Sequence, residues 1–126
     1  MTDEFDVVVF GSGAAGMTAA VVAACEGLRV GLFEKASQLG GTTATSGGAI
    51  WIPGNSLARA AGIADSLADA RRYLTAQLGS FMREDLVDAF LETGAEAVEY
   101  LAGRTEIRFD LMAAPDYVSS EPGAVE

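Results

Sequence analysis

The sequence contains no histidine, one cysteine and three prolines, and its basic residues are few. Histidine and cysteine are the usual ligands of transition metals, so we expect no metal site. A single cysteine, Cys25, also excludes a disulfide within the chain. Eight basic residues against eighteen acids give a net charge of −10 at pH 7. Because no basic stripe is present to neutralise phosphates, we expect no nucleic-acid partner.

A hydrophobic run long enough to span a bilayer is also missing. The most apolar stretch, from Ala14 to Cys25, is too short to span one, and acids rather than basic residues precede it. We therefore expect no integral membrane segment and a soluble, cytoplasmic protein. Half of the 126 residues are apolar, which is enough for a modest core.

What the sequence does contain is a strand, a glycine-rich turn, a helix and a second strand in close succession. The apolar residues Val7–Phe10 lead into a G-x-G-x-x-G turn at residues 11–16. The alanine-rich segment from Ala14 to Glu26 predicts a helix, Gly27 a helix end, and residues 29–33 a second strand. This order is typical of a dinucleotide-binding βαβ unit, so we predict an α/β fold.

Each glycine of the motif, and the acid after the second strand, has a separate physical task in such a unit. This sequence has the required residue at each of these positions. Gly11 permits the tight turn, Gly13 lets the backbone approach a pyrophosphate, and Gly16 lets the helix pack closely on the strand. Glu34 follows the second strand, where a carboxylate can accept hydrogen bonds from the hydroxyls of an adenosine ribose. The alternative is a strand–helix turn that binds no ligand.

A stretch rich in glycine, threonine and serine follows at residues 37–48. Its paired glycines would let the backbone lie against a flat or anionic ligand, with Thr42, Thr43 and Ser46 as hydroxyl donors. The alternative is an exposed loop of turn-forming residues.

The second half of the chain predicts helices. Ser66 is a candidate N-cap for a helix that ends at about Leu78, where Gly79 stops it. Another helical region begins near Arg83, with Gly94 as a break or bend, and its acids predict a solvated face. A third strand is possible at Thr105–Phe109, and residues 113–123 read as a loop.

Several of these segments together resemble the flavoprotein family of fumarate reductases and succinate dehydrogenases. They are Gly11–Gly16, Glu34-Lys35, Gly40–Thr43, Ser46–Gly48 and Ile50–Pro53, while Ala61–Ser66 and Pro115–Tyr117 are similar to the 3-ketosteroid Δ1-dehydrogenase branch. The resemblance implies a Rossmann-like FAD-binding domain followed by helices, of which residues 1–126 are the N-terminal part. It implies FAD without a covalent link, because the histidine that carries covalent flavin has no counterpart here.

The resemblance also implies roles for individual residues. The FAD site would be formed by Gly11, Ser12, Gly13, Ala14, Ala15, Gly16, Glu34, Lys35, Gly40, Gly41, Thr42, Thr43, Ser46, Gly47 and Gly48. Tyr117 would lie in the active site beside a second tyrosine, which takes a proton from the substrate while hydride passes to the flavin. A free phenol is a poor base at neutral pH, so Tyr117 would polarise that partner. The alternative is a half-buried tyrosine that anchors a loop.

Three functions remain open at this point. The first is the N-terminal portion of an FAD-dependent dehydrogenase that acts on CH–CH bonds next to a carbonyl, with a 3-ketosteroid as one substrate. The second is a fumarate-reductase-like enzyme that reduces an unsaturated acid. The third is an inactive fragment that binds a nucleotide, because half a Rossmann domain cannot exclude water from a flavin.

Overall fold

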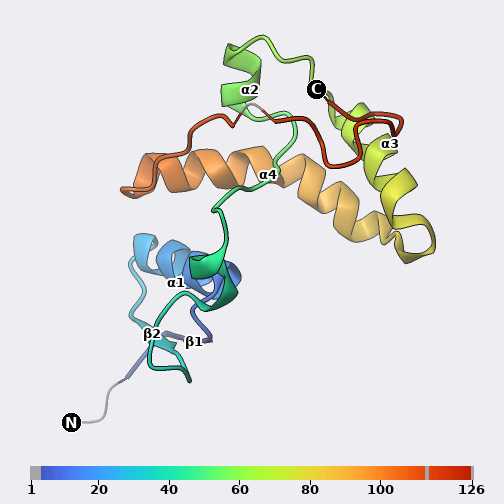
Figure 1. Cartoon of the computed structure of the whole chain (residues 1–126). Helices are drawn as coiled ribbons and strands as arrows, with labels where there is room; N and C mark the ends of the chain where they lie inside the picture. Colours follow the sequence, from blue (N-terminus) through green and yellow to red (C-terminus); the bar gives the residue numbers. More distant parts are fainter. Residues whose placement is uncertain (1–3, 113, 126) are drawn as a thin grey trace. The chain divides into compact units, whose positions relative to one another are not determined.

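In the computed structural model, two parallel strands and one helix form the N-terminal part of the chain (Figure 1). Strand β1 (Val7–Phe10) pairs with β2 (Val30–Phe33) so that Val7 lies opposite Val30 and Phe10 opposite Phe33. Helix α1 (Ala14–Cys25) connects the two strands and packs against both. The predicted βαβ unit and its α/β class are therefore confirmed.

The structure describes residues 4–112 and 114–125, and the chain divides into two units, Met1–Ile50 and Trp51–Glu126. We call them the N-terminal and the C-terminal unit. In the N-terminal unit the end of α1 is fixed by two backbone hydrogen bonds, from Leu28 to the Ala23 carbonyl and from Gly27 to that of Ala24. This is the Schellman pattern, and it confirms the helix end predicted at Gly27.

The C-terminal unit is built on two helices, α3 (Leu67–Leu78) and α4 (Glu84–Arg104), which pack against each other (Figure 1). A short 3₁₀ turn, η2 (Gly79–Phe81), joins them. The predicted cap is confirmed, because the Ser66 hydroxyl accepts a hydrogen bond from the Asp69 N–H at 3.0 Å. Between the helices lies a small apolar core of Ala70, Val87 and Leu91, with Leu74, Leu78 and Met82 against it.

A third, short helix in this unit was not predicted. Helix α2 (Ser56–Ala60) spans only five residues, too few to show a hydrophobic period. It begins where the Asn55 side chain accepts a hydrogen bond from the Ala58 N–H at 2.9 Å. The side-chain amide of Asn55 also donates to the Ile52 carbonyl. Asn55 thus connects the start of the helix to the segment that precedes it.

Two sequence predictions for this unit differ from the structure. Gly94 does not break the helix, because α4 runs through it from Glu84 to Arg104, while a bend at Gly94 stays a prediction. Gly94 is buried, and a Cβ there would lie 3.4 Å from the Ile52 side chain, at van der Waals contact. Residues 105–109 form no strand, and their polar groups bond locally, for example Ile107 N–H to the Thr105 hydroxyl. Residues 114–123 are a loop as predicted, while residue 113 lies outside the described residues.

Two acidic side chains of α4 form ion pairs with an arginine of α3. Arg71 of α3 donates to Asp88 at 2.7 Å and lies 3.5 Å from Glu84. This pairing lowers the pKa of Asp88. These charges are well exposed to solvent, so we expect the pair to orient the helices more than to stabilise them.

The described part of the chain holds no helix that is both long and apolar enough to span a membrane. Among the same residues no group of histidine, cysteine, aspartate or glutamate side chains is arranged to hold a metal ion.

Candidate cofactor site

The N-terminus of α1 is surrounded by the β1–α1 turn, the end of β2 and the loop that begins at Gly40. Ser12, in the turn, has a side chain that is only 1% exposed. Its hydroxyl donates to Glu34 Oε2 at 2.7 Å, and its backbone N–H donates to the same oxygen at 2.9 Å. The hydroxyl also accepts a hydrogen bond from the Gly40 N–H at 2.8 Å. One buried hydroxyl therefore joins three segments, which we call the Ser12 bridge.

The Glu34 carboxylate is held by both of its oxygens. The other oxygen, Oε1, accepts a hydrogen bond from the Ala36 N–H at 2.9 Å. That bond, followed by those from the Ser12 hydroxyl and the Ser12 N–H, lowers the pKa of Glu34 from 4.5 to about 2. The side chain is therefore an anion at neutral pH. Each carboxylate oxygen can accept two hydrogen bonds. Oε2 already accepts two and Oε1 accepts one, so Oε1 retains the capacity to accept one further hydrogen bond, from a ribose hydroxyl.

The predicted task of Gly16 is visible in the packing of α1 on the turn. A Cβ at Gly16 would lie 1.9 Å from the carbonyl oxygen of Gly11. Real Cβ atoms do not approach a backbone oxygen so closely, so any other residue would push the helix away from the turn. The close approach predicted from the glycine spacing is confirmed for this position.

The loop after β2 is folded back onto the helix terminus. Residues Gly41–Thr45 form a 3₁₀ turn, η1. The Thr43 hydroxyl accepts a hydrogen bond from the Ala14 N–H at 3.0 Å, and Gly41 lies close to Gly13. The first part of this stretch thus packs against the candidate site, although residues 41–48 are exposed to solvent as the alternative of a surface loop also predicts.

The N-terminus of α1 suits an anionic group. Within the described residues, the N–H groups of Ala15 and Gly16 have no hydrogen-bond acceptor. They open the helix, where the aligned peptide dipoles favour negative charge. The close glycine packing, the free N–H groups and the Glu34 carboxylate together fit a dinucleotide with a pyrophosphate and a ribose.

Among the described residues, the others predicted to bind the cofactor make no side-chain hydrogen bond to the Ser12 bridge or to the N-terminus of α1. The Ser46 hydroxyl donates to the Thr43 carbonyl and accepts from the Gly48 N–H, so it stabilises a local turn. The Thr42 carbonyl accepts a hydrogen bond from the Thr45 hydroxyl. Lys35 and Gly47 are exposed. A contact with the cofactor stays a prediction for these residues, as it does for those around the Ser12 bridge.

Tyr117 belongs to the C-terminal unit, and its side chain is fully exposed. The alternative of a half-buried tyrosine that anchors a loop is therefore wrong. The anchors are its neighbours instead: Asp116 accepts a hydrogen bond from the Trp51 indole, and the Val118 N–H donates to the Tyr73 hydroxyl. The sequence analysis did not identify these contacts. Trp51 and Asp116 lie 65 positions apart, so no local pattern in the sequence indicates their contact.

Comparison with known proteins gives one family whose model, described as an FAD binding domain, matches residues 6–125. A 3-oxosteroid 1-dehydrogenase of Mycobacterium tuberculosis is 42% identical over 121 residues, which are 95% of this chain and 22% of that protein. A 4-oxocyclohex-2-ene-1-carboxylate 5-dehydrogenase of Sinomonas cyclohexanicum is 43% identical over 94% of this chain and 20% of its own length.

Among solved structures, a 3-ketosteroid Δ1-dehydrogenase from Sterolibacterium denitrificans, in complex with 1,4-androstadiene-3,17-dione, matches with a TM-score of 0.87 and 42% identity. The match covers 98% of this chain and 22% of that one. The chain thus spans about a fifth of the length of the relatives it matches.

Proposed function

The chain belongs to the FAD binding domain family, and we propose that it is the N-terminal FAD-binding part of a dehydrogenase that oxidises CH–CH bonds next to a ketone. The Ser12 bridge at the N-terminus of α1 is the observation that carries this proposal, because it holds the Glu34 carboxylate, which would bind the ribose, beside the helix end that would bind the phosphates. The names of the relatives point to ketones as the substrate class. A cytoplasmic location is part of the same proposal.

The residues of the N-terminal unit would hold FAD without a covalent bond. The free N–H groups at the start of α1 would receive the pyrophosphate, and Oε1 of the ionised Glu34 would accept a hydrogen bond from a hydroxyl of the adenosine ribose. Bound FAD supplies the hydride acceptor for such a dehydrogenation. The protein's part is to position it and to keep the two carboxylate oxygens oriented through Ser12 and Ala36.

Tyr117 is our candidate for proton handling. Its phenol is exposed, while the backbone on either side is hydrogen-bonded to the rest of the unit. A phenol in that position can donate to or accept from a second acid–base group. We propose that Tyr117 acts on a partner group that removes a proton from the carbon next to the ketone.

The test is turnover by the full-length gene product. Purified protein with bound FAD is mixed with a 3-keto-4-ene steroid and an artificial electron acceptor, and reduction of the acceptor is followed. We expect turnover, and Tyr117→Phe to lower kcat while bound flavin is unchanged. A monocyclic 4-oxocyclohexane carboxylate serves as the second ketone. Turnover of neither ketone by protein that binds FAD would refute the dehydrogenase proposal.

Reduction of an unsaturated acid is a second candidate. It is favoured by a urocanate reductase of Eggerthella lenta, which is 38% identical over 80% of this chain and 17% of its own length. In this case an unsaturated acid would oxidise the chemically reduced flavin, and a saturated ketone would not reduce the oxidised flavin. Absorbance of the bound flavin distinguishes the two directions.

The third possibility, a nucleotide-binding fragment without chemistry, is decided by the size of the native product. An antibody to this segment should detect, in cell extract, a band several times heavier than the 13.0 kDa of these residues. A band at 13.0 kDa would leave nucleotide binding as the only activity to test.

A further inference from the structure

The residues on both sides of Tyr117 are fixed by hydrogen bonds, although the tyrosine itself is fully exposed. Asp116 Oδ1 accepts a hydrogen bond from Trp51 Nε1–H at 2.9 Å, and its Oδ2 accepts one from the Val125 N–H at 2.8 Å. The Asp116 N–H in turn donates to the Val125 carbonyl at 3.1 Å. On the other side, the Val118 N–H donates to the Tyr73 hydroxyl at 3.3 Å.

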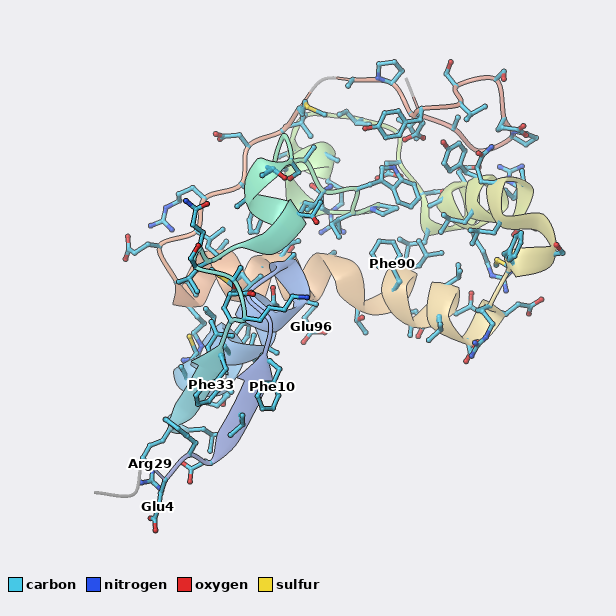
Figure 2. All side chains as sticks on the ribbon, turned by 60° about the horizontal axis from the view of Figure 1, so that its bottom comes forward. Glu4, Phe10, Arg29, Phe33, Phe90 and Glu96 are labelled. Carbon is cyan, nitrogen blue, oxygen red and sulfur yellow. The ribbon has the colours of Figure 1, made fainter. Side chains whose placement is uncertain are left out.

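These anchors rest on the two long helices of the C-terminal unit. Tyr73 of α3 is only 8% exposed. The Trp51 ring packs 5.9 Å from the Tyr73 ring and is stacked 6.2 Å from that of Phe90, which projects from α4 (Figure 2). Asp116 and Val118 therefore bond to side chains that are themselves held by aromatic packing.

The segment after Tyr117 is closed against α3 as well. Asp116 and Val125 exchange backbone and side-chain hydrogen bonds, so residues 116–125 form a closed loop. A Cβ at Gly123 would lie 2.1 Å from the Asp69 carbonyl oxygen, so the loop backbone touches the start of α3. Figure 1 shows this last segment of the chain running beside α3. The loop is thus attached at Asp116, Val118 and Gly123.

We propose that Asp116 is a positioning residue for Tyr117. Its carboxylate bridges the Trp51 indole and the Val125 amide, and this clamp sets the backbone from which the phenol of Tyr117 projects. The inference rests on the proposed function for the role of Tyr117. A side chain held in advance in its reactive position loses less freedom when it acts, and displacement by about 1 Å can lower a rate a hundredfold.

The experiment uses full-length protein with bound FAD and conservative variants. Asp116→Asn keeps the size of the side chain, but its single amide oxygen cannot replace both carboxylate oxygens. Trp51→Phe removes the indole N–H and keeps an aromatic ring. We expect each variant to lower kcat by about ten- to hundredfold, with KM and flavin absorbance little changed. Asp110→Asn, at an exposed aspartate of the same segment, is the matched control and should leave kcat unchanged.

Two readouts separate positioning from a general structural role. In a Tyr117→Phe background, neither Asp116→Asn nor Trp51→Phe should lower kcat further, since the group that they position is gone. Backbone hydrogen exchange, measured by mass spectrometry on the peptide that spans residues 116–125, should be faster in both variants than in the wild type and in Asp110→Asn.

The outcomes also separate this inference from the proposed function. Unchanged exchange in Asp116→Asn would overturn the clamp whether or not the protein turns over a ketone. A further fall of kcat in the Tyr117→Phe background would overturn the positioning role while the proposed function stands. A wild type that turns over no ketone refutes the proposed function, and faster exchange in Asp116→Asn then still supports the clamp.

Discussion

Each of the two units of this chain has an interior of a different kind. In the N-terminal unit the most buried side chain is a serine, Ser12, and its hydroxyl is engaged in hydrogen bonds. In the C-terminal unit the buried side chains are mainly apolar, with Val87 and Leu91 of α4 against Ala70 of α3. The first arrangement depends on the directions of polar groups, and the second on filled volume.

The surfaces of the two units carry different features, although both units expose aromatic side chains, Phe81 of the C-terminal unit among them. The sheet of the N-terminal unit carries Phe10, 81% exposed, and Phe33 beside it, with ring centroids 5.9 Å apart (Figure 2). By contrast, α3 and α4 each have an apolar side and a charged side, and their charges pair across the helices at Arg71 and Asp88. We infer that the candidate site is sensitive to changes in geometry, and the helical unit to changes in volume.

Gly16→Ala should have the largest effect, since it breaks the geometry of the N-terminal unit. Its Cβ would collide with the Gly11 carbonyl oxygen. We expect a loss of about 3–5 kcal/mol in the free energy of unfolding, and loss of bound FAD. Urea unfolding and the flavin absorbance of the full-length protein measure the two effects.

Gly103→Ala in α4 is the matched control, because a Cβ there meets no atom within 4 Å. It should stabilise the protein by about 0.5 kcal/mol, since alanine favours a helix more than glycine does. Equal behaviour of the two variants would contradict the close packing at Gly16.

Leu91→Ala tests the helical unit by removing volume from its core. Leu91 is 5% exposed, so we expect a loss of about 2–4 kcal/mol in the free energy of unfolding. Affinity for FAD, measured by titration at 25 °C, should be unchanged. Leu86→Ala, on the exposed side of the same helix, should have little effect. A fall in FAD affinity in Leu91→Ala would contradict the division of roles between the units.

Ser12→Ala removes the Ser12 bridge with little change in volume. The Gly40 N–H and one oxygen of Glu34 would each lose a partner. We expect a loss of about 1–2 kcal/mol in stability, together with weaker FAD binding. Ser37→Ala, at an exposed serine of the same unit, should change neither quantity. Wild-type FAD affinity in Ser12→Ala would show that the bridge does not orient Glu34 for the cofactor.

The smallest effect is the pH dependence that Glu34 contributes. Its pKa is about 2 in the folded protein, and its ordinary value is 4.5. The hydrogen bonds to the carboxylate therefore stabilise the fold fully above pH 4.5, and this contribution is lost as the pH falls toward 2. Urea midpoints of the wild type and of Glu34→Gln, compared between pH 7 and pH 2, should converge across this range. A difference that does not depend on pH would contradict the assignment.

The sequence was most informative where the causes are local. The glycine spacing at 11–16, the acid at Glu34 and the cap at Ser66 each depend on neighbours a few residues away or on a recurrent motif, and the structure has them where expected. Their local physics was enough to predict the βαβ unit and α3.

The rest depends on contacts between distant residues. Gly94 was predicted to break or bend its helix. In the structure α4 passes through Gly94 without a break, and the Ile52 side chain lies next to it. Residues 105–109 have the composition of a strand, yet no described strand pairs with them. The bond between Trp51 and Asp116 joins residues 65 positions apart. No periodicity or spacing reports such a contact, so the anchoring of the Tyr117 loop could be seen only in the structure.

The Ser12 bridge also has a consequence for how the N-terminal unit folds. Its hydroxyl bonds to residues 22 and 28 positions further along the chain. Glu34 follows β2 directly, so the bridge cannot close before β2 has aligned beside β1. Contacts of this separation form late, after the loop between them has been closed. Because the bridge is complete only in the folded unit, FAD that binds there would stabilise that fold by mass action.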